Sequence, residues 1–152
     1  MLIWYARWLR TGDEVKFDAE GNIFITDRIK DLIKVKGLQV APSELEGYLL
    51  SHPDVADAAV IGVADDYAGE LPRAFIVLKP EVAAAVQKEP RLVARVKENL
   101  CDTVASRAAK YKRLEGGVEF VDAIPKNGSG KILRRVLRDL HRRTRTRERA
   151  RL

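Results

Sequence analysis

Residues 27–46 read DRIKDLIKVKGLQVAPSELE and contain, in order, a turn, a short strand, a second turn and the start of a helix. Within 31–36 apolar side chains alternate with lysines, which predicts a strand with one buried face. Gly37 follows and predicts a turn. Four basic side chains crowd this short apolar segment: Arg28, Lys30, Lys34 and Lys36. So much charge would be unusual in a purely structural element, so the segment is also a candidate binding surface.

The residues after this turn predict a helix that begins near Pro42. Proline is common in the first turn of a helix, and Ser43-x-x-Glu46 fits a capping box, in which two side chains satisfy backbone N–H groups reciprocally. Pro53 cannot continue a helix, so we expect the helix to end before it.

Alternating apolar residues and turn signals predict the remaining elements of a small two-layer α+β domain. We expect a β-hairpin over 8–26, strands over 31–36, 56–64, 73–79 and 118–121, and helices over 42–53, 90–107 and 131–141. A two-stranded hairpin is marginal by itself in water, so this hairpin resembles a piece of a larger sheet. The chain thus divides into a hairpin remnant over 1–26, a domain over 27–141 and a basic tail over 142–152.

Length and composition indicate a single domain without disulfides. A chain of 152 residues can bury one modest core. Cys101 is the single cysteine, which excludes an internal disulfide and suits a reducing compartment. Its neighbours Leu100 and Val104 predict a helical core position, and a catalytic thiol is disfavoured because no basic residue adjoins it. No apolar run approaches the roughly 18 residues of a membrane span.

The net charge of +6 comes entirely from the end of the chain. Residues 134–152 hold nine arginines and two acidic residues, a net of +7, whereas the rest holds 19 basic and 20 acidic residues, a net of −1. A block of like charges is usually a solvated extension. Because the body is neutral, the sequence does not predict a nucleic-acid-binding face; binding through the arginine tail alone is the weaker alternative.

A second basic element, PKNGSGK over 125–131, precedes the last expected helix. It differs from the phosphate-binding loop G-x-x-x-x-G-K-[ST], because Gly128 and Gly130 are one residue apart and Ile132 follows Lys131. By itself it could be a glycine-rich loop with an incidental lysine. Similarly, Thr11-Gly12-Asp13 alone indicates only a turn.

Together, these three segments resemble the end of the adenylate-forming (AMP-binding) enzymes. That superfamily includes acyl-CoA synthetases, 4-coumarate–CoA ligases, beetle luciferases and peptide-synthetase adenylation domains. KVKGLQVAPSELE and PKNGSGKILRR are similar to the first three groups, since peptide-synthetase domains tend to carry an Arg-Gly-x-Arg-Ile-Glu pattern instead. The resemblance covers about residues 8–140. It implies the small mobile C-terminal domain of a ligase that joins a carboxylate to ATP as an acyl-adenylate, releasing pyrophosphate, and then transfers the acyl group to coenzyme A, releasing AMP.

The resemblance implies roles for residues at the hairpin. Asp13 would grip the ribose hydroxyls of ATP and of the adenylate, because a carboxylate can accept hydrogen bonds from two adjacent hydroxyls. Arg28 would contact the nucleotide; its structural alternative is a surface salt bridge. Lys30 stands at the hinge about which the small domain rotates between the half-reactions, with a solvated lysine as the alternative.

The resemblance also implies roles in the two chemical steps. Lys34 and Gly37 would line the channel that brings the thiol of coenzyme A to the adenylate, and Gln39 would lie near the active site. Lys131 would bridge the substrate carboxylate and the α-phosphate during adenylation, where a positive charge opposes the charge of the transition state. A flexible Gly-Ser-Gly segment would let it withdraw. Mg²⁺ is expected with ATP, without a protein ligand in this chain.

The large N-terminal domain of the family, with its phosphate loop and its acyl and adenine pockets, is absent from this sequence. We therefore expect a fragment that is inactive alone and needs the large domain in cis or in trans. The alternative is a stand-alone module that binds a nucleotide or a protein without catalysis. Ala150-Arg151-Leu152 is similar to the Ser-Lys-Leu peroxisomal signal, which predicts a peroxisomal import receptor as partner; otherwise the expected location is the cytoplasm.

Overall fold

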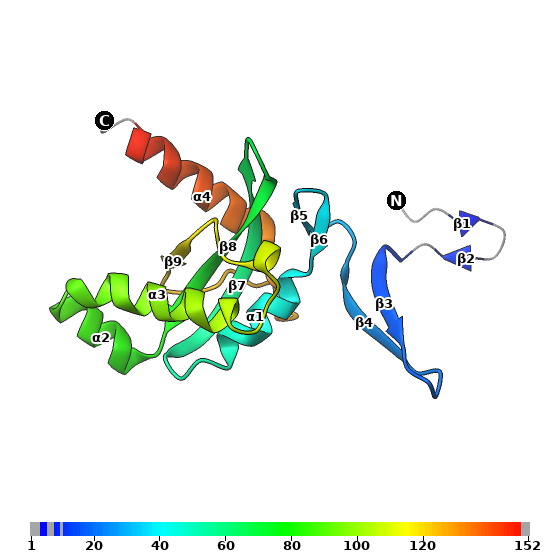
Figure 1. The fold of residues 1–152 in the computed structure, drawn as a ribbon, viewed down its shortest axis with the longest axis horizontal. Helices are drawn as coiled ribbons and strands as arrows, with labels where there is room; N and C mark the ends of the chain where they lie inside the picture. Colours follow the sequence, from blue (N-terminus) through cyan, green and yellow to red (C-terminus); the bar gives the residue numbers. More distant parts are fainter. Residues whose placement is uncertain (1–3, 6–7, 10, 150–152) are drawn as a thin grey trace.

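The computed structural model describes residues 4–5, 8–9 and 11–149, and its body is built on a five-stranded sheet (Figure 1). The strands of this sheet are β5 (Ile33–Val35), β6 (Leu38–Val40), β7 (Val55–Asp65), β8 (Gly69–Leu78) and β9 (Val118–Phe120). They follow the order β6-β5-β8-β7, and β9 pairs with β8 in parallel, whereas the other pairs are antiparallel. The strand β7 therefore forms one edge of the sheet.

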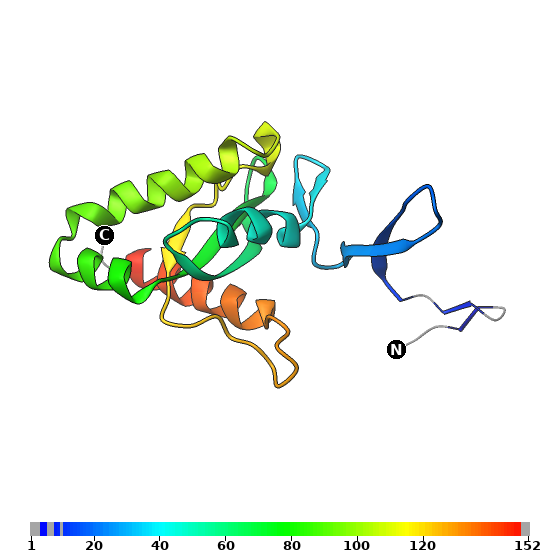
Figure 2. The ribbon, with the colours of Figure 1, turned by 90° about the horizontal axis from the view of Figure 1, so that it is seen from below.

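Helices cover both faces of the sheet. They are α1 (Pro42–Leu50), α2 (Pro80–Lys88), α3 (Arg91–Ala105) and α4 (Arg134–Arg149), with a short 3₁₀ helix at Lys110–Lys112. Figure 2 shows α3 on one side of the sheet and α4 on the other. Within the described residues, no helix is both long and apolar enough to cross a membrane. The predicted α+β class is confirmed.

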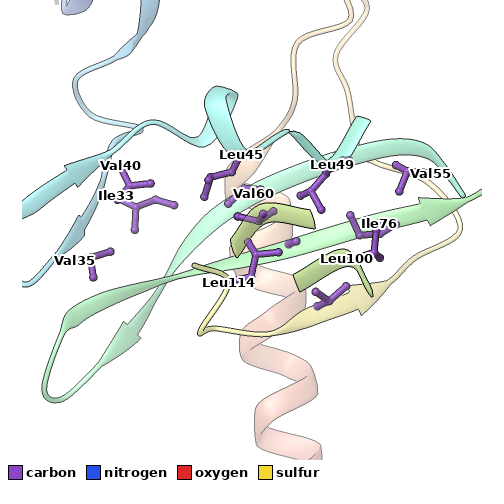
Figure 3. Packing of buried hydrophobic residues seen from close by; sticks show 14 of the residues in the cluster. Ile33, Val35, Val40, Leu45, Leu49, Val55, Val60, Ile76, Leu100 and Leu114 are labelled. Carbon is purple, nitrogen blue, oxygen red and sulfur yellow. The ribbon is translucent and has the colours of Figure 1, made fainter. Parts of the chain in front are cut away.

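The side chains of β7 point alternately to the two faces of the sheet and contribute to two separate core clusters. Ala58 and Val60 face the larger cluster, which α1 and α3 close, and Figure 3 shows Leu45, Leu49 and Leu100 gathered there. The residues between them, such as Ala59 and Ile61, face the smaller cluster around Leu137 of α4. Side chains of a strand point alternately to its two faces, so a continuous apolar run supplies both cores.

The N-terminal hairpin stands apart from this body (Figure 1). It consists of β3 (Asp13–Phe17) and β4 (Ile23–Arg28), paired antiparallel, and is preceded by the two-residue strands β1 (Trp4–Tyr5) and β2 (Trp8–Leu9). Its large apolar side chains are exposed: Phe17 by 66%, Ile23 by 62%, Phe24 by 55% and Ile25 by 68%. An isolated hairpin that exposes this much apolar surface agrees with the predicted remnant of a larger sheet.

Several boundaries differ from the sequence prediction. The strand β6 and the helix α2 were not expected; β6 is only three residues long and offers almost no alternation to recognise. The strand β8 begins at Gly69 instead of residue 73, so the loop predicted over 65–72 is a short turn. The helix α4 begins at Arg134 instead of Lys131 and continues to Arg149, because its arginines favour helix and no Gly or Pro stops it. Residues 142–149, expected as a tail, are thus helical.

The predicted capping box at the start of α1 is wrong. The residue that caps the helix is Ala41, which makes no side-chain hydrogen bond, and Ser43 lies inside the first turn. The cap comes from β4: the Asp27 carboxylate accepts hydrogen bonds from Ser43 N (3.2 Å) and Ser43 Oγ (3.0 Å). A carboxylate at a helix N-terminus satisfies an N–H group and is favoured by the helix dipole. This contact also ties the hairpin to α1.

Candidate functional site

A cleft of about 1050 Å³ lies where the hairpin meets the sheet. Its walls come from the segment before β3, the turn after β4, and the strands β5, β6 and β8. The lining residues are Thr11, Gly12, Asp13, Ile29, Lys30, Leu32, Lys34, Gln39, Gly69 and Glu70. Four residues singled out from the sequence, namely Asp13, Lys30, Lys34 and Gln39, thus meet in one cavity although they come from four different segments.

Asp13 lines the cleft, and Arg28 pairs with it from the neighbouring strand of the hairpin. They are cross-strand partners in the hairpin, and Arg28 Nε lies 3.2 Å from Asp13 Oδ1. The backbone N–H of Asp13 donates to Thr11 Oγ1 (3.3 Å), and Ile29 N donates to Gly12 O (2.9 Å). The Asp13 side chain is 17% exposed, whereas that of Arg28 is 46% exposed. The salt bridge considered as the structural alternative for Arg28 is therefore present, and its partner is Asp13, the residue expected to bind the ribose.

Lys30 lies in the turn that joins the hairpin to the sheet. Asp31 N closes this turn by donating to Arg28 O (2.9 Å), and the Lys30 side chain is exposed. Its position between two elements agrees with the geometry expected of a hinge residue, which absorbs backbone rotation at the end of an element.

Lys34 and Gln39 project into the cleft from a tight hairpin. They are direct cross-strand partners in β5 and β6, and the two residues of the connecting turn, Lys36 and Gly37, have φ values of 50° and 81°. Two consecutive positive φ angles are the geometry of a type I′ turn. Lys36 adopts this conformation at a steric cost, because it is not a glycine. Gly37 beside it has no side chain and leaves the backbone accessible.

A neighbouring turn supports this hairpin from the end of β7. Lys36 N donates to Ala68 O (2.8 Å), and Lys36 Nζ lies 4.4 Å from the ring centroid of Tyr67, which is 83% exposed. Glu70 Oε2 accepts the backbone N–H of Lys34 (2.9 Å). The Glu70 carboxylate also lies over Gly62, where a Cβ atom would come within 2.9 Å of it. Glu70 is a cleft residue that the sequence analysis missed, because its partners are far from it in the chain.

The Lys131 loop, defined as residues 125–131, lies outside the lining of this cleft. Figure 2 shows it projecting on the side of the sheet opposite to α3. An isolated bridge pairs Lys126 with Ile132, and Asn127 Oδ1 accepts hydrogen bonds from Ser129 N (3.1 Å), Ser129 Oγ (2.8 Å) and Lys131 N (2.8 Å). One asparagine thus organises the Gly-Ser-Gly segment into a closed turn. The loop is more constrained than the sequence suggested, while the Lys131 side chain stays exposed.

Glu46 is the single buried charged residue among the described side chains. Its Oε1 lies 2.9 Å and its Oε2 3.1 Å from Nη2 of Arg134, and Oε1 also accepts the backbone N–H of Val60 (2.8 Å). Burial raises the pKa of the Glu46 carboxyl above its ordinary value, although Arg134 and the Val60 N–H act in the opposite direction. The sequence assigned Glu46 to a capping box, and nothing local could reveal a partner 88 residues away.

Two further predictions concern cysteine and metal chemistry. Cys101 lies in α3 and packs against the larger core cluster, as expected, and burial raises the pKa of its thiol. A raised pKa leaves little thiolate, which disfavours a nucleophilic role. Among the described residues, no cluster of three His, Cys, Asp or Glu side chains could hold a metal ion.

The model of the AMP-binding enzyme C-terminal domain matches residues 44–131, more than half of the chain and up to the lysine of the Lys131 loop. The chain belongs to this family. The chain is 51% identical to 4-coumarate–CoA ligase-like 1 of Arabidopsis thaliana over 132 residues, covering 87% of this chain and 22% of that protein. It is 47% identical to the luciferin 4-monooxygenase of Photuris pensylvanica over 133 residues, covering 88% of this chain and 22% of that one.

Solved structures agree with the assignment. The o-succinylbenzoate CoA synthetase of Bacillus subtilis, in complex with its acyl-adenylate intermediate, superposes with a TM-score of 0.72 at 37% identity, over 88% of this chain and 25% of that one. The chain therefore spans about a fifth to a quarter of the length of these relatives, and it corresponds to the C-terminal domain of the acyl-CoA and 4-coumarate–CoA ligase family.

Proposed function

We propose that this domain is the mobile lid of an acyl-CoA ligase and works with a large N-terminal domain. The complete enzyme would convert a carboxylate and ATP to an acyl-adenylate and pyrophosphate, and then convert the adenylate and coenzyme A to an acyl-CoA and AMP. The observation that carries this proposal is the placement of the lysines: Lys34 lies in the cleft with Asp13 and Gln39, whereas Lys131 lies on a separate loop outside it. Two separated cationic elements suit two successive steps.

Lys131 would act in the first step. Its exposed ammonium group would bridge the attacking carboxylate and the α-phosphate and oppose the charge that develops there. Mg²⁺ would accompany ATP and neutralise the leaving pyrophosphate. Because no acidic cluster in the described part of this chain could hold the ion, its protein ligands would lie on the large domain.

The cleft residues would act on the nucleotide and in the second step. Asp13 would accept hydrogen bonds from the ribose hydroxyls, with Arg28 orienting its carboxylate and contacting the nucleotide. Lys34, Gly37 and Gln39 would line the path of the coenzyme A thiol, since the turn at Gly37 leaves room for a ligand against the backbone. Rotation of the domain at Lys30 would exchange the orientation used for adenylation, with Lys131 at the active site, for the one used for thioester formation, with Lys34 there.

The exposed apolar side chains of the hairpin indicate where the large domain packs. Phe17, Ile23, Phe24 and Ile25 lie on β3 and β4 and face solvent in this chain. We propose that the sheet of the large domain covers them, which explains why a two-stranded hairpin carries so many apolar residues. A stand-alone binding module would have no use for Asp13, Lys34 and Lys131 together.

We further propose that Ala150-Arg151-Leu152, which lies outside the described residues, acts as a peroxisomal address. A fusion of a fluorescent protein to residues 142–152 would then accumulate in peroxisomes, and deletion of the last three residues would return it to the cytoplasm. Cytoplasmic location of both forms would contradict this assignment.

The function is tested in a fusion enzyme, in which this chain replaces the corresponding C-terminal segment of the Arabidopsis 4-coumarate–CoA ligase-like 1 protein. With a carboxylic acid that the unmodified relative activates, we expect the fusion to release pyrophosphate and to form the CoA thioester. The isolated chain should do neither. A well-folded fusion that forms no adenylate would contradict the proposed function. An immunoblot of the native product adds a second test, since a band near 17.1 kDa would require partnership in trans.

A further inference from the structure

The buried ion pair between Glu46 and Arg134 joins two elements that are far apart in the chain. Glu46 belongs to α1 on one face of the sheet, and Arg134 begins α4 on the other face. Their side chains are only 10% and 12% exposed. The pair therefore passes around the edge of the sheet at β7.

The third member of this contact is the edge strand itself. Among the described strands, β7 pairs only with β8, so every second backbone N–H of β7 points away from the sheet. Val60 N is one of these groups, and Glu46 Oε1 accepts its hydrogen at 2.8 Å. An unpaired edge N–H in a buried position is costly, and the carboxylate satisfies it. Glu46 is thereby fixed in register with one residue of β7.

The Lys131 loop is bracketed by two ion pairs to this edge. Arg134 follows Lys131 by three residues, and at the start of the loop Lys126 Nζ lies 2.5 Å from Oδ2 of Asp57 on β7. The pair with Asp57 is solvent-exposed, with side chains 38% and 29% exposed, whereas the pair with Glu46 is buried. Exposed pairs are weak and adaptable, so the buried pair sets the position of the loop more strongly.

We propose that Glu46 and Arg134 are positioning residues for Lys131. The pair holds the end of the Lys131 loop at a fixed place on the edge of β7, so that the lysine enters the active site of the large domain in one geometry. This proposal rests on the proposed role of Lys131 in adenylation. Catalysis is sensitive to displacements of about 1 Å, which explains a fixed ionic anchor beside a loop that carries a catalytic lysine.

Stability alone is a poor explanation for this pair. Burying two charges removes their hydration, and an apolar pair of similar size is often equally stabilising or more so. An apolar pair would leave the Val60 N–H without an acceptor and would not define the direction from which Arg134 approaches. The ionic pair fixes the positions of α1, β7 and the start of α4 relative to one another.

The first test uses the isolated chain and measures amide hydrogen exchange at Lys131, whose N–H is bonded to Asn127 Oδ1. Glu46→Gln keeps an acceptor for Val60 but removes the charge opposite Arg134. We expect about tenfold faster exchange at Lys131 because the anchored end of the loop loosens. Glu119→Gln is the matched control, because Glu119 forms a comparably placed ion pair with Arg73 at 2.8 Å, with side chains 20% and 21% exposed, between β9 and β8. Exchange equal in both variants would overturn the proposal.

The second test uses the fusion enzyme and separates the half-reactions. In Glu46→Gln we expect kcat for pyrophosphate release to fall about tenfold, with KM values unchanged, while thioester formation from preformed acyl-adenylate keeps its rate. The double variant Glu46→Gln with Arg134→Met removes both charges. Its melting temperature should stay at or above that of the unmodified fusion, because an apolar pair avoids the cost of burying two charges, whereas its adenylation rate should not recover.

Recovery of the adenylation rate in the double variant, or equal loss of both half-reactions in the single variant, would show a merely structural pair and overturn the proposal. The unmodified fusion distinguishes this failure from that of the proposed function. If it forms no adenylate, the proposed function fails, and with it the catalytic purpose of the pair. The exchange experiment still decides whether the pair anchors the loop.

Discussion

The turn at Lys36–Gly37 and the Lys131 loop differ in what holds them in place. The first belongs to the sheet: Lys34 pairs with Gln39 across the strands, and the backbone of Lys36 is bonded to that of Ala68. The second closes on itself through backbone hydrogen bonds, such as Asn127 N to Lys131 O (2.9 Å), but ion pairs of Lys126 and Arg134 hold it against the rest of the fold. Backbone ladders define a position whatever the side chains are, whereas side-chain anchors can be removed one residue at a time. The two elements should therefore respond differently to mutation.

They also lie in different parts of the molecule. The turn borders the cleft that contains Asp13, whereas the Lys131 loop projects on the α4 side of the sheet (Figure 2). The proposed function therefore requires two orientations of the domain, with Lys30 as the proposed hinge. Each prediction below tests this division between the two elements.

The largest effect is expected for Lys131→Ala in the fusion enzyme. Removing the charge that stabilises the transition state should slow adenylation by roughly 100- to 1000-fold. The rate of thioester formation from preformed adenylate should change by less than about twofold, because Lys131 would act only in adenylation. Pyrophosphate release and single-turnover thioester assays measure the two steps. Unchanged adenylation would mean that Lys131 has no catalytic role.

Lys34→Ala should give the opposite pattern with a smaller effect. We expect thioester formation to slow by about tenfold, because the thiol path loses a positioning charge, while adenylation changes less than about twofold. The same two assays apply. Equal loss in both steps would contradict the separation of the lysines into two functions.

Asp13→Asn should weaken binding of ATP by the fusion enzyme. A hydrogen bond to a charged group contributes roughly 1.5–3 kcal/mol, so KM for ATP should rise about tenfold or more, with a small change in KM for the acid. Asp18→Asn is a control in the same hairpin, where the carboxylate accepts hydrogen bonds from Asn22 at the far turn. An equal rise in KM for ATP in both variants would assign the effect to the hairpin fold instead of the ribose contact.

Gly37→Ala should destabilise the isolated chain by about 1 kcal/mol, because alanine at a φ of 81° is strained. Gly128→Ala in the Lys131 loop is a matched control. Neither glycine has an atom within 4 Å of a Cβ added to it, and Gly128 is not among the residues with positive φ. Urea unfolding should show no loss of stability for the control. Equal losses would mean that the turn is not defined by its backbone conformation.

The smallest effect concerns pH and Glu46. Its pKa is raised in the folded chain by burial, so the folded state holds the proton more tightly than the unfolded state. This contribution to stability is complete below the ordinary pKa of about 4.5 and is lost as the pH rises toward the folded pKa. The unfolding free energy of the wild type relative to Glu46→Gln should therefore decline with rising pH in this window. A relative stability that increases with pH would contradict the raised pKa.

Most of the elements could be predicted from the sequence because their signals are local. The lysine alternation before Gly37 defined β5 and its turn, and the apolar stripe containing Leu100 defined α3. Asp13, Lys34 and Lys131 became candidates through the resemblance of the motifs around them to those of the adenylate-forming enzymes. Short-range patterns of this kind report the pitch of a helix, the pleat of a strand or the chemistry of a turn.

Other features depend on residues that are distant in the chain. Ser43-x-x-Glu46 has the form of a capping box, but Asp27 supplies the cap and Glu46 forms an ion pair with Arg134. Local spacing could not reveal this, because packing of α1 and α4 around the edge of β7 determines which partner the carboxylate meets. The amino-acid sequence by itself thus determined most of the elements, the family and the candidate lysines. Only the tertiary structure placed Lys34 in a cleft with Asp13 and Lys131 on a loop outside it, because those positions depend on how the hairpin, sheet and helices pack.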